Sequence, residues 1–488
     1  MSLKIYSICL LMAISTQIKG QNIKPASIFG DHMVLQQGIN APVWGTSKTN
    51  QELIISLAGN NISVKADQQG KWMAKLKPMK SGGPFRMIIS SSGDSVIYND
   101  VMVGEVWLAS GQSNMQMILA AAKDADKEIQ EASYPQIRFF TVGLNISRTP
   151  LDHVKGSWKL TNPENAKDFS AAAYFFSREL HLERKTPVGI ISSSWGSTSS
   201  EAWTSGKSLA TFPGLKDSVA RYESLQEDWE ELYRAFEAKE RNSKTKPVFP
   251  KQKNYPTALY NAMIAPLVPY GIKGVIWYQG ENNSSRAIQY RSLFPLLIAD
   301  WRNQWDNQKL PFLFVQLANF RAANPQPVFA DKWALLREAQ SMALELPHTG
   351  MAVSIDIGDA KNIHPKNKQD VGKRLYLAAS HIAYGKSLVY SGPIYKSMKV
   401  MDNKIELSFN HIGAGLMQKG TPLTAFEIAG ADKKFHWAEA TIDGNKIIVS
   451  SKNVSKPVAV RYAWSDNPAA SLYNKEGLPA SPFRTDDW

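Results

Sequence analysis

VMVGEVWLASGQSNM, residues 101–115, is the stretch that decides the fold of this chain. An apolar run rich in valine leads into a small polar turn that contains Gly111, and an apolar, helix-like segment follows over 115–122. This order predicts a buried strand, a tight turn and a helix, the first step of an α/β layer. Open α/β sheets bind ligands at the carboxyl ends of their strands, so Ser113 lies where a nucleophile would act. The alternative is that Ser113 only caps the helix.

The composition is typical of a globular protein and excludes several classes of function. The chain has 488 residues, of which 43% are hydrophobic and 20% charged, and this length predicts two or more domains. Its net charge of +13 is spread evenly, without an Arg/Lys block, so no nucleic-acid partner is predicted. No phosphate-binding glycine motif occurs, and the one cysteine is Cys9, so the sequence predicts no nucleotide, no metal and no other cofactor.

The first 20 residues resemble a secretory signal peptide. Lys4 precedes an apolar run over 5–14, and small and polar residues continue to Gly20. Cleavage after Ser15 and cleavage after Gly20 both fit the pattern. The apolar run is too short to span a bilayer, and the rest of the chain has no apolar run of 18 residues. We therefore expect an exported protein, periplasmic or extracellular, with no membrane span.

Hydrophobic patterning divides the mature chain into three parts. Short strand-like runs separated by turn signals predict an N-terminal β-sandwich domain over 21–100. Strands and helices alternate over 101–390, which predicts an α/β/α domain with a mostly parallel sheet covered on both faces. An insertion at 213–253 has apolar residues at spacings of three and four, the pattern of an amphipathic helix. Strand-like runs return over 391–488 and predict a C-terminal β domain.

A serine nucleophile needs a base, and one of the eight histidines is well placed. His364 lies in a loop that leaves the carboxyl end of the last predicted parallel strand. Two other strand-end loops offer donors for an oxyanion: Gly196 allows close approach of the backbone, and Gln279 has a side-chain amide. The plain alternatives are a solvated loop histidine and ordinary turns.

Four short blocks connect these candidates to a known family. Gly-Gln-Ser-Asn-Met at 111–115, Trp-Gly-Ser-Thr at 195–198, Trp-Tyr-Gln-Gly-Glu-Asn at 277–282 and Ile-His-Pro-Lys-Asn-Lys at 363–368 occur in this order. Together they resemble the blocks of the SGNH-type hydrolases of the sialate O-acetylesterase family. The resemblance implies an SGNH-like three-layer domain that hydrolyses carbohydrate O-acetyl esters, with O-acetylated sialic acid as the first candidate substrate. Acetylxylan or pectin would require the same mechanism, and a non-catalytic glycan-binding protein is the alternative from another class.

The resemblance also implies roles for individual residues. Ser113 would be the nucleophile and His364 the general base. The backbone N–H groups of Ser113 and Gly196, with the Gln279 side chain, would form the oxyanion hole. Contacts to the O-acetylated carbohydrate are expected from Gln112, Asn114, Trp195, Glu281 and Asn282.

The third member of the triad departs from the SGNH pattern. Related hydrolases often have an aspartate three residues before the histidine, and here that position is Lys361. Asp359 is the nearest acid and is our expected partner for His364. Asp356, Glu281 and a backbone carbonyl are the alternatives.

Overall fold

The central sheet of the protein organises the whole molecule. The computed structural model describes residues 22–215, 253–327, 331–420 and 422–488, with isolated positions between 220 and 238. The strand order is β10-β9-β11-β8-β12-β13-β14, and every neighbouring pair is parallel except β10 with β9. The strands are β8 (Asp94–Gly111), β9 (Tyr134–Thr141), β10 (Trp158–Thr161), β11 (Val188–Ser194), β12 (Gly274–Tyr278), β13 (Phe312–Val315) and β14 (Thr349–Ala352).

Helices cover both faces of this sheet, because successive strand residues point to opposite sides. Trp107 packs against Phe176 of α4 (Ala171–Arg184), with ring centroids 5.0 Å apart, and α9 (Lys368–Ile382) shares that core. On the other face, Trp277 packs against Trp301 of α7 (Ala287–Gln304) at 5.7 Å, and α8 (Lys332–Met342) lies beside α7. The mixed α/β class is confirmed. Among the described residues, this layer also has four short helices: α1 (Ser113–Gln116), α2 (Ala125–Gln130), α3 (Pro163–Ala166) and α5 (Gly206–Leu209).

Strand β8 belongs to two parts of the molecule. Its first half pairs with β7 (Gly82–Ser91) and β2 (Val34–Gln36), and its second half lies between β11 and β12. Exposure alternates over 94–100, and every residue over 101–111 is buried. The change in composition near residue 100 therefore marks the point where one strand enters the buried sheet, and the strand itself continues across it.

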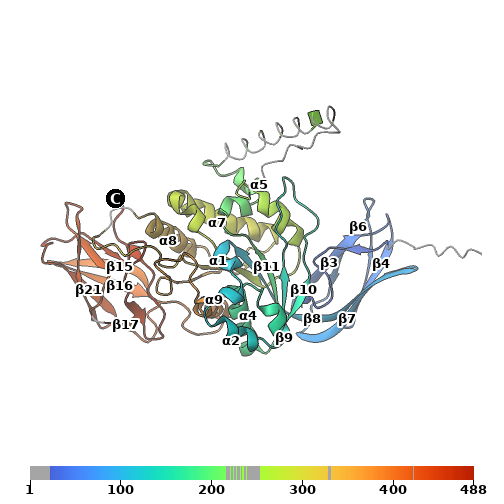
Figure 1. Cartoon of the computed structure of the whole chain (residues 1–488), viewed down its shortest axis with the longest axis horizontal. Coiled ribbons are helices and arrows are strands. Elements are labelled where there is room, and N and C mark those ends of the chain that lie inside the picture. Colours follow the sequence, from blue (N-terminus) through green and yellow to red (C-terminus); the bar gives the residue numbers. More distant parts are fainter. Residues whose placement is uncertain are drawn as a thin grey trace, which may run out of the picture.

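The N-terminal region, blue in Figure 1, consists of strands only. One sheet has the order β1-β3-β6, and the other joins β4, β5 and β7 to β8. Buried side chains from both sheets, such as Val43, Leu53 and Ala74, belong to one core. The remaining strands of these two sheets are β1 (Lys24–Pro25), β3 (Ala41–Thr46), β4 (Glu52–Leu57), β5 (Asn60–Lys65) and β6 (Lys71–Leu76).

The C-terminal region lies at the opposite end of an elongated molecule (Figure 1) and is also built of strands. Its sheets have the orders β15-β16-β21-β20, β19-β18-β22-β24 and β17-β23. The strands are β15 (Ile394–Met401), β16 (Lys404–Asn410), β17 (Leu416–Gln418), β18 (Phe426–Ala429), β19 (Phe435–Trp437), β20 (Glu439–Asp443), β21 (Lys446–Ser450), β22 (Ala459–Tyr462), β23 (Leu472–Asn474) and β24 (Phe483–Arg484).

A buried arginine joins this region to the central layer. Arg337 of α8 donates to the carbonyl oxygens of Leu317 and Ala318 in the central layer at 2.8 Å each. It also donates to the carbonyl oxygens of Ser465 and Asp466 in the C-terminal region, at 2.7 and 2.9 Å. One side chain thus satisfies four backbone acceptors at the boundary.

Two sequence predictions fall on other parts of the chain. The predicted signal peptide at 1–20 and most of the predicted helical insertion at 213–253 lie outside the described residues. Within the described part of the chain, no helix is both long and apolar enough to cross a bilayer.

Candidate active site

Ser113 is held at the carboxyl end of β8 by a turn that requires glycine. Gly111 has φ +133°, and a Cβ there would lie 2.2 Å from the carbonyl oxygen of Tyr278 in β12. This close approach places Ser113 at the first position of α1, and Gln112 occupies the N-cap. The alternative that Ser113 only caps the helix is therefore excluded, because Gln112 is the N-cap and the Ser113 hydroxyl bonds to another group.

That group is the imidazole of His364, in the loop between β14 and α9. His364 Nε2 lies 2.8 Å from Ser113 Oγ, although the two residues are 251 positions apart. The Asn362 side chain accepts the His364 backbone N–H at 2.9 Å, and the Asn114 amide donates to the Ile363 carbonyl at 3.0 Å. Burial lowers the pKa of His364, and the nearby Lys368 ammonium lowers it further. A neutral imidazole is therefore ready to accept the serine proton.

The structure places the expected third member elsewhere. Asp359 accepts the backbone N–H of Lys361 at 2.8 Å, in a loop that bridges to Phe320. Asp356 pairs with both terminal nitrogens of Arg374 at 2.6 and 2.8 Å. Among the described residues no side chain or carbonyl bonds to His364 Nδ1, so the arrangement is a serine–histidine pair. Asp359 is committed to its own loop, because this loop folds against residue 320.

Two of the three expected oxyanion donors, the backbone N–H groups of Ser113 and Gly196, lie at the nucleophile. Ser113 occupies the first helical position, where a backbone N–H has no acceptor within the helix. A Cβ at Gly196 would lie 3.2 Å from Ser113 Cβ, so the Gly196 backbone borders the nucleophile. The Gly196 N–H donates to Gln116 Oε1 at 2.7 Å.

The structure does not bring Gln279 to Ser113. Its side chain is fully buried, and its amide donates to the Thr198 carbonyl at 3.1 Å and to Asn283 Oδ1 at 2.6 Å. Its oxygen accepts the Tyr290 hydroxyl at 2.9 Å. These three partners occupy the amide within the core, and the prediction of Gln279 as an oxyanion donor is wrong for this arrangement.

The serine and histidine open onto a cavity of about 540 Å³. None of the five residues expected to contact substrate lines it. Gln112 and Asn114 are buried, and Trp195 lies under the Lys253 ammonium, 5.7 Å from the ring centroid. Asn282 donates its backbone N–H to Gln112 Oε1 at 3.4 Å. The described residues that line the cavity are Ser113, Gln116, Met117, Ile118, Ala121, Asn362, His364 and Lys366.

Asn114 and Glu281 belong instead to a buried polar network behind the pair. Lys368 Nζ donates to Asn114 Oδ1 at 2.7 Å and to the Pro365 carbonyl at 2.8 Å. The Asn114 amide donates to Glu281 Oε1 at 2.6 Å, and Glu281 Oε2 has no partner. Burial lowers the pKa of Lys368 to about 7 and raises that of Glu281. Since Asn114 also bonds to residue 363, the network connects the helix of the serine to the loop of the histidine.

Four residues of this site were not predicted from the sequence: Lys368, Gln116, Asn362 and Lys366. Lys368 gave a usable signal, because it is the first residue of α9 and a cation there opposes the helix dipole. The other three carry no signal in the sequence, because a cavity wall appears only when distant loops meet. Among the described residues, no group of three His, Cys, Asp or Glu side chains is arranged to hold a metal ion.

Comparisons with known proteins identify the family of this chain. A family model described as carbohydrate esterase, sialic acid-specific acetylesterase, matches residues 103–381. The chain belongs to the sialate O-acetylesterase family. The family member from Rattus norvegicus is 32% identical over 528 residues, which cover 97% of this chain and 96% of that protein. The member from Homo sapiens is 31% identical over 519 residues, which cover 95% and 92%.

A solved structure extends the likeness from sequence to shape. A carbohydrate acetylesterase from Xanthomonas citri is 41% identical to this chain, with a TM-score of 0.85 over 96% of this chain and 100% of that one. Membership in the family confirms the resemblance found in the four blocks. It also makes this protein a carboxylic ester hydrolase.

Proposed function

We propose that this esterase removes O-acetyl groups from carbohydrates through an acetyl-enzyme formed on Ser113, in an SGNH-like domain. The observation that carries the proposal is the contact of 2.8 Å between Ser113 Oγ and His364 Nε2 at the wall of an open cavity. A serine with only a structural role would require neither a bonded histidine with a lowered pKa, such as His364, nor a cavity beside its hydroxyl.

The steps follow from the positions of these groups. Ser113 Oγ attacks the acetyl carbonyl carbon while His364 Nε2 takes the hydroxyl proton. The backbone N–H groups of Ser113 and Gly196 stabilise the oxyanion, the latter after it separates from Gln116. The imidazolium returns its proton to the sugar oxygen, which leaves as a hydroxyl. Water then attacks the acetyl-enzyme with His364 again as base, and acetate is released.

Charge at the cavity favours an acidic sugar among the candidate substrates. Lys366 lines the cavity, and Lys253 donates to the carbonyl oxygen of Gly196, the residue beside Ser113, while no described carboxylate lines the cavity. The carboxylate of an O-acetylated sialic acid suits these cations, as in the proteins named sialate O-acetylesterase. Acetylxylan and acetylated pectin are the alternatives, since the chemistry at Ser113 would be the same.

The decisive experiment replaces the nucleophile. Ser113→Ala should lose hydrolysis of p-nitrophenyl acetate and labelling by a fluorophosphonate while keeping the wild-type thermal transition. A folded Ser113→Ala enzyme with near wild-type turnover contradicts the mechanism, and a wild-type chain that resists the label supports a non-catalytic glycan-binding protein. Acetate release from O-acetylated sialic acid, compared with acetylxylan and pectin, identifies the substrate.

Export is the second part of the proposal and rests on residues 1–20. The positive residue, the apolar run and the small residues that follow match a signal peptide. N-terminal sequencing of the protein secreted by an expression host should find a start at residue 16 or 21. A protein that keeps Met1 and stays inside the cell contradicts export.

A further inference from the structure

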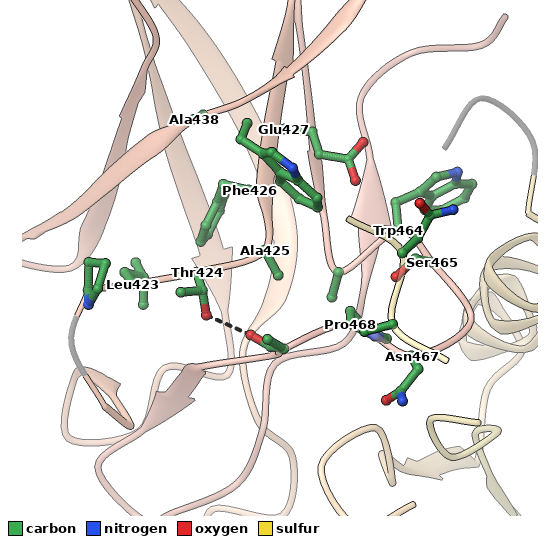
Figure 2. A pocket seen from close by; sticks show the side chains of 16 residues that line it. Leu423, Thr424, Ala425, Phe426, Glu427, Ala438, Trp464, Ser465, Asn467 and Pro468 are labelled. Atoms are coloured by element: carbon green, nitrogen blue, oxygen red, sulfur yellow. Dashed lines mark hydrogen bonds between the residues drawn. The ribbon is translucent and has the colours of Figure 1, made fainter. Parts of the chain in front are cut away.

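A second cavity lies between the C-terminal sheet and the loop that follows β13. It has a volume of about 320 Å³, and its wall includes Asn324 of that loop together with Phe426, Glu427, Trp437 and Trp464 (Figure 2). The volume is at the lower end of the range for small-ligand pockets, roughly 300–1,000 Å³. The cavity therefore has room for about one ring.

Glu427 is the unusual member of this wall. It is 1% exposed, and its Oε2 atom has no hydrogen-bond partner. In the β19-β18-β22 sheet Glu427 is directly opposite both Trp437 and Arg461, so the three side chains share one face. Arg461 is bound by both oxygens of Asp486, at 2.8 and 2.7 Å. Burial and the nearby Asp486 raise the pKa of Glu427 to about 8 against the opposing effect of Arg461, so the carboxyl is mostly protonated at neutral pH.

Two other polar side chains of the wall, Thr424 and Asn467, already have partners. Thr424 Oγ1 donates to the Ala469 carbonyl at 2.6 Å. The Asn467 amide donates to the Arg321 carbonyl at 2.6 Å, and its oxygen accepts from Asn319 at 2.7 Å. Glu427 Oε2 is thus a buried polar atom without a protein partner, and a hydroxyl group of a bound molecule would satisfy it.

Aromatic side chains give the cavity its second property. Trp437 is 43% exposed although it lines a pocket, and its indole N–H donates to the Pro325 carbonyl at 2.9 Å. This bond holds the Trp437 ring against the loop that follows β13. In Figure 2 the Trp464 ring and the Glu427 carboxyl lie on neighbouring sides of the same space. A ligand would meet flat apolar surfaces and one neutral hydrogen-bonding group.

We propose that this cavity is a secondary binding site for one uncharged sugar ring of a polymeric glycan, separate from the Ser113 cavity. A pyranose presents apolar faces to aromatic rings and hydroxyl groups at its edge, which matches this wall. Neither a cation nor an anion would find an opposite charge in this wall, because Glu427 is neutral and Arg461 and Asp486 are paired with each other. The proposal rests on the proposed function for its choice of a glycan. It implies that the esterase is held on the polymer whose acetyl groups it removes.

The test uses the full chain carrying Ser113→Ala, so that no substrate is consumed. Affinity electrophoresis in gels with deacetylated xylan free of uronic acid side groups, an uncharged polymer, should retard the protein. Trp437→Ala and Glu427→Leu should each reduce this retardation at least about fivefold. Glu427→Gln, which keeps a neutral hydrogen-bonding group, should retain most of it. Val400→Ala, an exposed apolar position on β15 of the same region, serves as the matched control.

Kinetics separate this site from the catalytic one. In the otherwise wild-type enzyme, Trp437→Ala should raise KM for acetylxylan and leave hydrolysis of p-nitrophenyl acetate unchanged. Absence of retardation by xylan overturns the proposal, and so does retardation that Trp437→Ala and Glu427→Leu leave intact. Equal loss with Val400→Ala also overturns it. Fluorophosphonate labelling of Ser113 reports independently on the proposed function, so the two failures are distinguishable.

Discussion

The neutral imidazole of His364 is the residue on which the proposed chemistry depends, and it predicts a pH profile. Catalysis requires the unprotonated ring, and burial together with Lys368 lowers the pKa of His364. Activity should therefore be present above this lowered pKa and fall as the pH drops through it, with the acidic limb of kcat/KM below 6.5. Lys368→Met removes the neighbouring charge, so the limb should move to higher pH, whereas Lys361→Met in the same loop should not move it. An unchanged limb in Lys368→Met contradicts the coupling.

Gln116 provides a second test at this scale. Its oxygen accepts the Gly196 N–H at 2.7 Å, the donor that the oxyanion needs. Gln116→Ala removes this competitor, whose hydrogen bond is worth about 0.5–1.5 kcal/mol, so kcat/KM for p-nitrophenyl acetate should rise about 2- to 10-fold. Gln116→Glu places a carboxylate at the donor and should lower kcat/KM. A loss of activity in Gln116→Ala would instead assign the side chain to substrate binding.

Sequence reasoning predicted some side chains at this site and misplaced others. Ser113 and His364 follow strand ends, and the topology of a parallel sheet brings such positions to one edge. Asp359 and Gln279 also follow strands, but each found a closer partner within its own loop or core. A sequence predicts the position of a residue at a strand end, but the nearby hydrogen-bond donors and acceptors decide which way its side chain points.

The turn after β8 is the element that sets the position of the nucleophile. Gly111→Ala would combine a positive φ with a Cβ contact of 2.2 Å to a backbone oxygen. We expect the strain to exceed the ~1–3 kcal/mol of an unfavourable backbone conformation, with a lower Tm and little remaining activity. Gly59→Ala is a matched control, because Gly59 has φ +81° and open space around it, and it should lose much less. Equal effects on Tm would show that contact with Tyr278 is unimportant.

Helices and strands were easier to predict from the sequence than the residues at which they begin and end. Buried apolar runs and amphipathic helices between them predicted the α/β layer, since burial imposes those patterns. The predicted boundary between residues 100 and 101 falls within β8, because the pattern changes where exposure changes while the backbone continues unbroken. Local composition records the surroundings of a strand and carries little information on where it ends.

At the scale of the whole molecule, Arg337 joins the central layer to the C-terminal region. Four carbonyl oxygens accept from it, and it is fully buried. Arg337→Met would leave the carbonyl oxygens of Leu317 and Ser465 without a donor, at about 1–3 kcal/mol for each buried group that stays unpaired, while Ala318 and Asp466 would still accept from the Trp333 indole and the Phe320 N–H. We expect Tm to fall by several degrees, measured by calorimetry, while Lys332→Met at the exposed start of α8 should have little effect. A wild-type Tm in Arg337→Met would show that the regions are joined mainly by other contacts.

The contacts at this boundary also extend to the active-site loop that carries His364. Residues 319–321 bond to the loop of His364 through Asn319 Oδ1 with the Gly358 N–H at 2.7 Å, and through the Arg321 N–H with the Ala360 carbonyl at 3.1 Å. Arg337→Met should therefore also lower kcat in the folded enzyme below its Tm. The sequence near residue 337 does not predict this role, because the two acceptors in the C-terminal region lie 128 and 129 positions away.

Strand β8 carries a consequence for how this protein can be shortened or recombined. A gene fragment that starts at residue 101 would begin halfway along the strand that carries Ser113 and would lose the partners of its first half. Exchange of the N-terminal unit between relatives keeps this strand whole only where the crossover falls before residue 94 or beyond residue 111. A recombined gene that keeps β8 whole therefore takes Ser113 and the strand that pairs with the N-terminal unit from the same parent.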